Sequence, residues 1–516
     1  MPELTTCIPD CFRRWPVLLT VFLWYGILPL RAQTTLQPPR SGEIEIHHAN
    51  EMEIIDDAHE KMKKLTGDVV LQQNNVILMS DQVNLYDEEN RAIANGHVKI
   101  IQDTVVITAD HLNYDGHKRK AVLNGHVVLT NRKMTLSTSE LEYDLNTRTG
   151  TYTKHAVVRT DSSVLTSMRG RYFANTNDVL FSDSVHITDP RYTLAADSLR
   201  FNTDNKTSYF LGPTHIFTDS ARIYCERGYY DTEHNRSLFT QHAQVKNGGQ
   251  WLQADSLLYN MKTGAGEGFN QVRFSDSAEQ VLLLGGYARY NQHTRSVYAN
   301  RHPVLINVID HDSLFLTGEE LYSDYDTLRQ VRSFRAFHKV RVYKSDMQAL
   351  TDSLSFSYAD STFRLFGHPV LWVDSNQLRG DTINIRMSRN QLSKIYLRRA
   401  AFVVNAADTG RFNQIQGKNM TGLFHNGKMT ELDVDGNGES IYFARQDSGG
   451  YLGMNKALCS NMIIFVQDNK LDHILFLTKP EATLYPLSQV PAGEDRLKNF
   501  TWLFGQRPKS KNEILR

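Results

Sequence analysis

The chain has 516 residues, of which 41% are hydrophobic and 10% aromatic, with 57 basic and 57 acidic side chains. This length allows a large hydrophobic core, and the balanced charge argues against general binding to nucleic acid or anionic membranes, which requires a basic excess. With 14 prolines and 31 glycines, the composition is not that of a disordered chain.

Residues 1–32 form a predicted secretory signal peptide. Arg13 and Arg14 precede an apolar run at 15–30, and Ala32 provides a small residue before a polar stretch. The run is shorter than the roughly 20 residues that a membrane-spanning helix needs. An uncleaved membrane anchor is the alternative interpretation. Residues 33–42 are then a linker to the mature protein.

The mature chain retains two cysteines, Cys225 and Cys459, which are 234 positions apart. Two distant thiols do not form a disulfide framework, and no spacing typical of metal ligands is present. We therefore expect neither a metal nor a cofactor.

A nine-residue motif recurs along the chain. It reads ITADHLNYD at 107–115, LSTSELEYD at 136–144, LAADSLRFN at 194–202 and LQADSLLYN at 252–260. Aligned units start at 78, 107, 136, 165, 194, 223 and 252, always 29 residues apart, and continue at 283, 316, 349, 378, 415 and 458. An earlier unit is expected from residue 47. Self-similarity at a fixed period is typical of repeat architectures.

Each unit has three recurrent positions. The third is small, as in Ala109, the fourth is often acidic, as in Asp110, and the eighth is usually aromatic, as in Tyr114. Apolar residues alternate with period two before Asp110, and with the opposite parity from Leu112 onward. Because a one-residue slip turns side chains to the other face of a sheet, we expect a bend or bulge at the acidic position. There the carboxylate would bond its own backbone.

The second half of each unit predicts another strand, as in KAVLNGHVVLT at 120–130, and turn-forming runs such as YDGHK and NTRTG connect the strands. One unit offers about four inward side chains worth about 2 kcal/mol each. Ordering its 29 residues costs on the order of 40 kcal/mol, so stacked units must share one core. We predict an all-β fold, an elongated and twisted repeat β-jelly roll or solenoid of stacked antiparallel strands with an apolar groove.

The units, with their small-Asp-x-Leu-x-Tyr core and the NGHV that follows at 95–98 and 124–127, resemble the OstA-like family of periplasmic lipopolysaccharide-transport proteins. The likeness covers nearly all of 43–480. It implies a twisted, slightly open β-jelly roll whose modules join end to end. We accordingly expect a first module at 43–205, a second module of continuing repeats at 206–480 and a basic C-terminal tail at 481–516.

The resemblance implies a non-enzymatic protein that binds lipopolysaccharide and shelters the acyl chains of lipid A in a β groove on the way to the outer membrane. Exposing one fourteen-carbon chain to water would cost on the order of 10 kcal/mol. The implied partners are lipopolysaccharide, other β-jelly-roll transport components and an outer-membrane assembly protein, joined by pairing of edge strands. A homo-oligomer is a further alternative, and no nucleic acid is expected. The implied location is the periplasm, in association with the outer membrane.

Inward apolar positions are the candidate lipid contacts. They are Ile107, Leu112, Tyr114, Leu136, Leu141, Tyr143, Leu194, Leu199 and Phe201. The alternative is that they only fill a closed core, as periodic apolar positions usually do. No catalytic residue is expected, because the chain has no G-x-S-x-G, H-E-x-x-H or P-loop motif.

Two further patterns resemble metal sites. His97, His126 and His155 recur at 29-residue spacing and would suit a metal ladder, but a solvent-facing column explains the spacing equally well. The segment DVDGNG at 433–438 imitates the start of a calcium loop, although its twelfth position is Ala444 rather than Glu. A Gly-rich hairpin is the better interpretation.

Two other functions remain open. A structural or adhesive β-solenoid without lipid cargo would have a solid interior. A polysaccharide-acting β-helix enzyme would have a surface cleft with clustered carboxylates or a metal.

Overall fold

The computed structural model describes residues 42–56, 61–132, 134–278, 280–309, 312–328, 330–389, 391–446, 449–467 and 470–515. The predicted signal peptide, and all of the predicted linker except Gly42, lie outside these ranges. Within them, no helix is long and apolar enough to cross a membrane.

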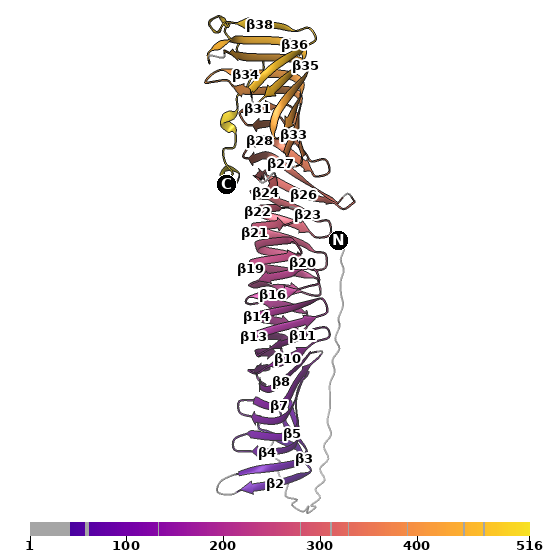
Figure 1. Cartoon of the computed structure of the whole chain (residues 1–516). Coiled ribbons are helices and arrows are strands. Elements are labelled where there is room, and N and C mark those ends of the chain that lie inside the picture. Colours follow the sequence, from indigo (N-terminus) through magenta and orange to yellow (C-terminus); the bar gives the residue numbers. More distant parts are fainter. Residues whose placement is uncertain are drawn as a thin grey trace, which may run out of the picture.

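The strands stack into one long column, with β2 near one end and β38 at the other (Figure 1). They form a single 38-stranded sheet in which neighbouring strands pair antiparallel. The predicted elongated all-β fold of stacked antiparallel strands is therefore confirmed.

The first half of the column alternates long strands with pairs of short strands that break at a corner. Its strands are β1 (Glu45–His48), β2 (Glu51–Asp56), β3 (Lys61–Gln73), β4 (Val76–Tyr86), β5 (Arg91–Gln102), β6 (Val105–Asp115), β7 (Lys120–Asn131), β8 (Met134–Asp144), β9 (Thr149–Tyr152), β10 (Ala156–Arg159), β11 (Val164–Ser167), β12 (Arg169–Phe173), β13 (Asp178–Asp189), β14 (Tyr192–Asn202), β15 (Thr207–Phe210), β16 (Thr214–Phe217), β17 (Arg222–Cys225), β18 (Arg227–Asp231), β19 (Arg236–Asn247) and β20 (Gln250–Asn260).

The second half continues in the same manner and ends in three short helical turns. Its elements are β21 (Ala265–Asp276), β22 (Val281–Asn291), β23 (Ser296–Asn300), β24 (Val304–Ile309), β25 (Asp312–Thr317), β26 (Glu320–Asp326), β27 (Val331–Lys344), β28 (Met347–Ser357), β29 (Thr362–Phe366), β30 (Val370–Val373), β31 (Asn376–Arg379), β32 (Thr382–Ser388), β33 (Gln391–Ala406), β34 (Phe412–His425), β35 (Lys428–Arg445), β36 (Tyr451–Gln467), β37 (Lys470–Leu477), β38 (Glu481–Tyr485), the 3-10 turns η1 (Leu487–Gln489) and η2 (Phe504–Gln506), and α1 (Asn512–Leu515).

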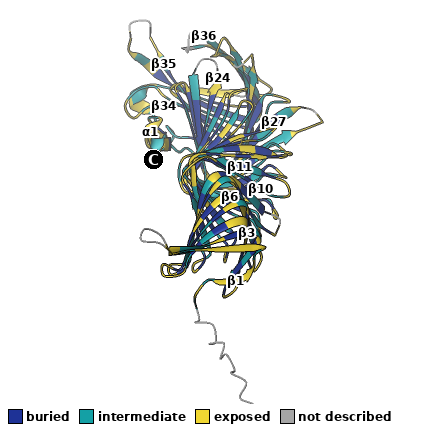
Figure 2. Ribbon diagram, turned by 90° about the horizontal axis from the view of Figure 1, so that it is seen from below, coloured by how far each residue is buried: buried dark blue, intermediate teal, exposed yellow. Residues whose placement is uncertain are grey.

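Each long strand contributes to two walls that meet at a corner. In β6, Val105, Ile107 and Ala109 are buried on the first wall, and Leu112 and Tyr114 are buried on the second. The parity of burial changes at the corner between Ala109 and Leu112, as predicted. The buried side chains of both walls face one another across the interior, where they form one hydrophobic core from Leu65 to Ile464 (Figure 2).

The bulge at the corner lies on a different strand from the one predicted. The register shift between β5 and β6 skips Gly96 and His97 of β5, whereas the acidic strand β6 turns without an extra residue. Of the expected bend or bulge at Asp110, the bend is therefore confirmed and the bulge is wrong. The bulged strand is the NGHV strand, because Gly reaches positive φ without strain and His is among the residues that tolerate it.

Pairs of consecutive positive-φ residues recur at the corners. They are Gly67–Asp68, Gly96–His97, Gly125–His126, Asp183–Ser184, Gln241–His242, Asn270–Gln271, Arg301–His302, His338–Lys339, Gly367–His368, Arg399–Ala400, Gly436–Asn437 and Thr478–Lys479. The DVDGNG segment supplies one of these bulges, inside β35, so its interpretation as a hairpin is wrong.

The column widens toward its C-terminal end. The strands β4 to β8 have 11 or 12 residues, whereas β33 to β36 have 14 to 18. The lengthening of the strands accounts for the longer sequence strides after residue 378. Across the predicted module boundary at 205 and 206, β14 pairs with β15, so the sheet is continuous there. The division into two modules stays a prediction.

The C-terminal segment returns along the outside of the column from β38 toward β27 (Figure 1). We call residues 486–515 the strap. Leu497 of the strap is buried in a second hydrophobic cluster with Phe402, Ile441 and Phe443. Near its end, Arg341 of β27 donates to the carbonyl oxygen of Glu513 at 3.2 Å. The predicted basic tail is therefore packed onto the sheet.

Candidate functional site

The nine predicted lipid contacts all lie in the interior, at 0–3% exposure. The structure brings several of them together in cross-strand rows. Ile107 and Leu136 both pair with Leu129 of β7, and Leu112 and Leu141 both pair with Leu123. Their inward orientation agrees with the sequence pattern. In this closed arrangement they pack against one another, so contact with lipid requires the two walls to separate.

The two walls are joined where their hairpins meet, opposite the corners. We call this line the closing edge. Gln73, at the end of the first wall, donates from Nε2 to the carbonyl oxygen of Gly116 on the second wall at 2.9 Å. The hydroxyl of Tyr114 donates to Gln73 Oε1. One unit later, Gln102 donates to the carbonyl oxygen of Leu145 at 3.0 Å.

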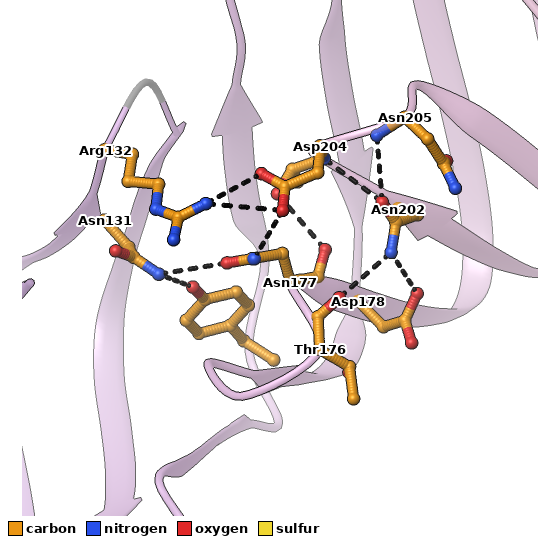
Figure 3. A network of polar contacts seen from close by, with 10 residues as sticks. Asn131, Arg132, Thr176, Asn177, Asp178, Asn202, Asp204 and Asn205 are labelled. Atoms are coloured by element: carbon orange, nitrogen blue, oxygen red, sulfur yellow. Dashed lines mark hydrogen bonds and ion pairs between the residues drawn. The ribbon is translucent and has the colours of Figure 1, made fainter. Parts of the chain in front are cut away.

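Asn131 occupies the next place on the closing edge (Figure 3). Its Nδ2 donates to the hydroxyl of Tyr172 and, at 3.2 Å, to Oδ1 of Asn177. Asn177 in turn donates to Asp204 at 2.7 Å, and Arg132 reaches the same carboxylate at 3.4 Å. The network links the hairpin of one wall to two successive hairpins of the other.

Farther along the chain, the closing edge contains a buried ion pair. The hydroxyl of Tyr290 donates to Gln250 at 2.6 Å, and Gln250 donates to Asp276 at 2.7 Å. Arg332 lies 3.4 Å from the same Asp276 carboxylate and donates to Ser323 at 2.7 Å. Both members of the ion pair are about as buried as the surrounding core. The walls are therefore held together by polar contacts at this level as well.

The tyrosine hydroxyls of the closing edge are un-ionised at physiological pH. Burial raises the pKa of Tyr143 and of Tyr290 to about 12. Burial also raises the pKa of Tyr114 and of Tyr172. The cause is loss of hydration, which disfavours the phenolate. The aromatic position of the repeat thus combines a ring in the core with a hydroxyl at the closing edge.

A cavity of about 630 Å³ lies in the C-terminal part of the roll, where the strands are longest. Its apolar lining from the first wall comprises Leu378, Val403 and Ile415. From the second wall it comprises Ile395, Leu397, Phe424, Met429, Leu432, Ile464, Val466, Leu471 and Ile474. The row Ile395, Gly422, Leu432, Ile464 and Ile474 runs across neighbouring strands, and the ring of Phe424 packs over Gly422.

One side of this cavity is polar. Asn376, Asn405 and Asn413 line it from the first wall, together with Arg445. Here the hydrogen bonds join hairpins of the same wall, because Asn405 donates to Asn376 at 3.2 Å and Arg445 donates to the carbonyl oxygen of Ala407 at 2.7 Å. The cavity therefore combines an apolar interior with a rim of amide and guanidinium groups, which suits an amphiphile.

Sequence reasoning did not find this cavity. Its lining residues follow the same alternation as the closed repeats, so their type gives no signal. The lengthened strides of 37 and 43 residues between the units at 378, 415 and 458 mark the region. Longer strands separate the hairpin ends from the corner and leave more interior to fill.

The acidic corners make contacts with the neighbouring strand. His97 Nδ1 lies 2.8 Å from Asp81, and His126 Nδ1 lies 2.8 Å from Asp110. The expected bonding of these carboxylates to their own backbone is therefore corrected to a cross-strand pair with the bulge histidine. In the described part of the chain, no group of three or more His, Cys, Asp or Glu residues is placed to hold a metal ion.

Comparisons with known proteins bear on the N-terminal third of the chain. Residues 41–197 match the sequence profile of the family described as OstA-like protein. We call residues 41–197 the OstA-like segment. The resemblance is therefore confirmed for the OstA-like segment, and the likeness of the later repeats stays a prediction. No curated protein matches the chain.

Among solved structures, the chain is similar to the one described as LptH, the LptA homologous periplasmic component of the conserved lipopolysaccharide transport device from Pseudomonas aeruginosa. The two sequences are 13% identical, the match covers 26% of this chain and 79% of that one, and the TM-score is 0.14.

Proposed function

We propose that the protein is a periplasmic transport or assembly protein that binds lipopolysaccharide and shelters the acyl chains of lipid A inside the roll on the way to the outer membrane. The observation that carries the proposal is the cavity of about 630 Å³ that continues the apolar core. The OstA-like segment at 41–197 supports it independently.

The cavity has the size of an acyl-chain site, and the side formed by the second wall is apolar. Its volume lies within the range of about 300–1,000 Å³ common for pockets that bind small molecules. Removing a fourteen-carbon chain from water gains on the order of 10 kcal/mol. In the C-terminal part of the roll, an acyl chain can obtain this gain without first breaking a packed core. Elsewhere, residues such as Leu112 and Leu199 become accessible to an acyl chain only after the walls separate.

The ends of the column offer surfaces for transport partners. On the edge strand β2, Met52 and Ile54 are exposed, and at the other end Leu475 and Leu484 are exposed. Exposed edge strands pair readily with other chains. We propose that other β-jelly-roll components and an outer-membrane assembly protein dock there by strand pairing, with a homo-oligomer as the alternative.

Photo-crosslinking tests the proposal directly. A photoreactive residue at Leu432 or Ile415 in the cavity should capture lipid A in the native envelope, and one at the outward-facing Asn113 should not. Capture at Leu199 would add evidence that the closed rungs open during transport. Two results would favour the lipid-free structural solenoid. One is capture of lipid A from outward positions alone, and the other is the absence of bound lipid in native mass spectra of protein purified from its own envelope.

We propose no enzymatic activity for the protein. The enzyme alternative requires a cleft with clustered carboxylates or a metal acting on a glycan. Incubating the purified protein with polysaccharide from the same envelope should give no turnover, and release of shorter glycans would contradict the proposal.

A further inference from the structure

The closing edge contains a column of buried amides with a regular spacing. Gln73, Gln102 and Asn131 follow one another at intervals of 29 residues and are only 3–4% exposed. Each lies at the hairpin end of the first wall and donates to a group on the second wall. A packed core alone would not need amides here, since apolar residues of the same size would close the walls without polar groups to satisfy.

Several polar atoms of this column have no hydrogen-bond partner. They include Oε1 of Gln102 and Oδ1 of Asn131, and the hydroxyl of Tyr143 faces the Arg148 side chain without forming a well-aligned hydrogen bond; all three residues are buried. A buried acceptor or donor without a partner typically costs about 1–3 kcal/mol. Their repetition along one line indicates a capacity for hydrogen bonding that the closed protein does not use.

Separation of the walls would expose this column at the border between the apolar interior and water. The amides and hydroxyls would then lose the bonds that they make across the edge, while acyl chains entered between Leu112, Leu123 and Leu141. A ligand with polar groups at the base of its acyl chains would replace those bonds. An unfunctionalised hydrocarbon would not.

We propose that the closing edge is the binding site for the neck of a multi-acyl amphiphile, the amide, ester and hydroxyl groups that join its acyl chains to a sugar. The free acceptors Gln102 Oε1 and Asn131 Oδ1 take the N–H or O–H groups of the neck. The Tyr143 hydroxyl donates to an ester or amide carbonyl. The proposal rests on the proposed function and deepens it by assigning the residues that recognise the polar part of the cargo.

Because Gln73, Gln102 and Asn131 are regularly spaced, the proposed binding site recurs along the closing edge. A unit of 29 residues contributes two strands, and neighbouring strands lie about 4.8 Å apart, so equivalent sites recur about every 10 Å along the column. A neck that leaves Gln102 therefore meets the same chemistry at Asn131. This arrangement lets the cargo move along the roll without returning its polar groups to an apolar environment.

Tyr143→Phe tests the assignment with little risk to folding, because the hydroxyl that it removes only faces Arg148 and forms no well-aligned hydrogen bond in the closed protein. Tyr229→Phe, a half-buried tyrosine that packs beside Tyr209, is the matched control. Binding of purified lipid A and of myristate to the full chain is measured by fluorescence. We expect Tyr143→Phe to weaken lipid A binding by about fivefold, the loss of one hydrogen bond, with myristate binding and the control unchanged.

Gln102→Met provides a second variant, because it removes the free acceptor together with the bond to Leu145. The proposal is overturned if wild-type protein binds lipid A and both variants bind it equally well, or if lipid A and myristate weaken in parallel. If the wild-type protein does not bind lipid A, this result would instead contradict the proposed function itself. If the Gln102→Met protein does not fold, the binding of lipid A to Tyr143→Phe decides the test.

Discussion

The imidazole Nδ1 of His97 lies 2.8 Å from the Oδ2 of Asp81, across the corner between β5 and β4. His97 has positive φ, and its neighbour Gly96 packs directly against the same carboxylate. The acidic and histidine positions of the repeat are therefore one unit, in which a carboxylate of one strand fixes the bulge of the next.

This pair predicts a pH dependence. The hydrogen bond that the His97 imidazolium donates to Asp81, with the negative charge of that carboxylate, raises the pKa of His97 above its usual value. A histidine whose folded-state pKa is raised stabilises the fold below the unfolded pKa of about 6.5, and this contribution is lost as the pH rises through the folded pKa. NMR titration should therefore give a His97 pKa above 6.5.

Asp81→Asn should bring the His97 pKa down toward the ordinary value. Asp110→Asn is the matched control, because Asp110 contributes only a smaller electrostatic effect to His97, and its replacement should lower the pKa less. An equal effect of the two variants would show that the hydrogen bond is not the dominant cause.

The bulge glycine predicts a specific loss of stability. Gly96 has a φ of 79°, and a Cβ at this position would overlap the Asp81 carboxylate. Gly96→Ala should therefore cost more than the roughly 1–2 kcal/mol of left-handed strain alone. Gly427→Ala measures that strain by itself, since Gly427 has a φ of 76° and no atom within 4 Å of the added carbon.

Hydrogen exchange of the β5 and β6 amides is the suitable measurement, because a long repeat protein opens locally rather than in two states. We expect faster exchange around the corner in Gly96→Ala than around the β34–β35 hairpin in Gly427→Ala. Equal acceleration in the two variants would argue that the carboxylate moves aside freely.

The stacked strands and their buried faces could be predicted from the sequence, whereas the backbone conformation of the corners could not. The alternation around Ile107 and Leu112 depends only on which face is buried, so it appears directly in the residue types. The bulge was assigned to the wrong strand because the corner pairs share no residue pattern: Gly96–His97 contains a glycine, whereas Arg399–Ala400 does not. Their conformation is imposed by the register of the neighbouring strands, which the local sequence does not show.

The candidate site divides in the same way. The inward residues, Tyr114 among them, were identified because burial follows the repeat. The closing edge was missed because Gln102 and Asn131 stand beside turns, where polar residues usually face water. The cavity lies where the strands are longest, and the separation of the two walls there is a property of the assembled roll.

The strap predicts a local effect of losing one buried glutamine. Gln377 is fully buried, donates to the carbonyl oxygen of Thr501 at 2.7 Å and accepts from the amide of Leu503 at 2.7 Å. Gln377→Leu leaves both backbone groups without these bonds, which should cost about 1–3 kcal/mol of strap attachment. Limited proteolysis should then cleave the strap faster than in Gln391→Leu, an exposed control, and equal cleavage rates would contradict the expected role.

The two cysteines should be inert in the folded protein. Burial raises the pKa of Cys225 to about 12 and also raises the pKa of Cys459. Because the thiolate is the reactive form, neither should react with a thiol reagent at pH 8 until the protein unfolds. The single variants Cys225→Ala and Cys459→Ala assign each thiol, and rapid labelling of native protein at Cys225 would show that β17 opens under native conditions.

Filling the C-terminal cavity should reduce lipid capture while preserving the fold. Val466 is half-buried and lines the cavity from β36, so a tryptophan there can occupy the empty volume without displacing a packed side chain. In Val466→Trp, crosslinking of lipid A from Leu432 should fall several-fold, whereas the thermal transition should stay close to that of the wild type. Val122→Trp introduces the same ring at a position that is 36% exposed and should leave capture unchanged. Undiminished capture from Leu432 in Val466→Trp would mean that acyl chains do not occupy this cavity and would redirect attention to the closed rungs.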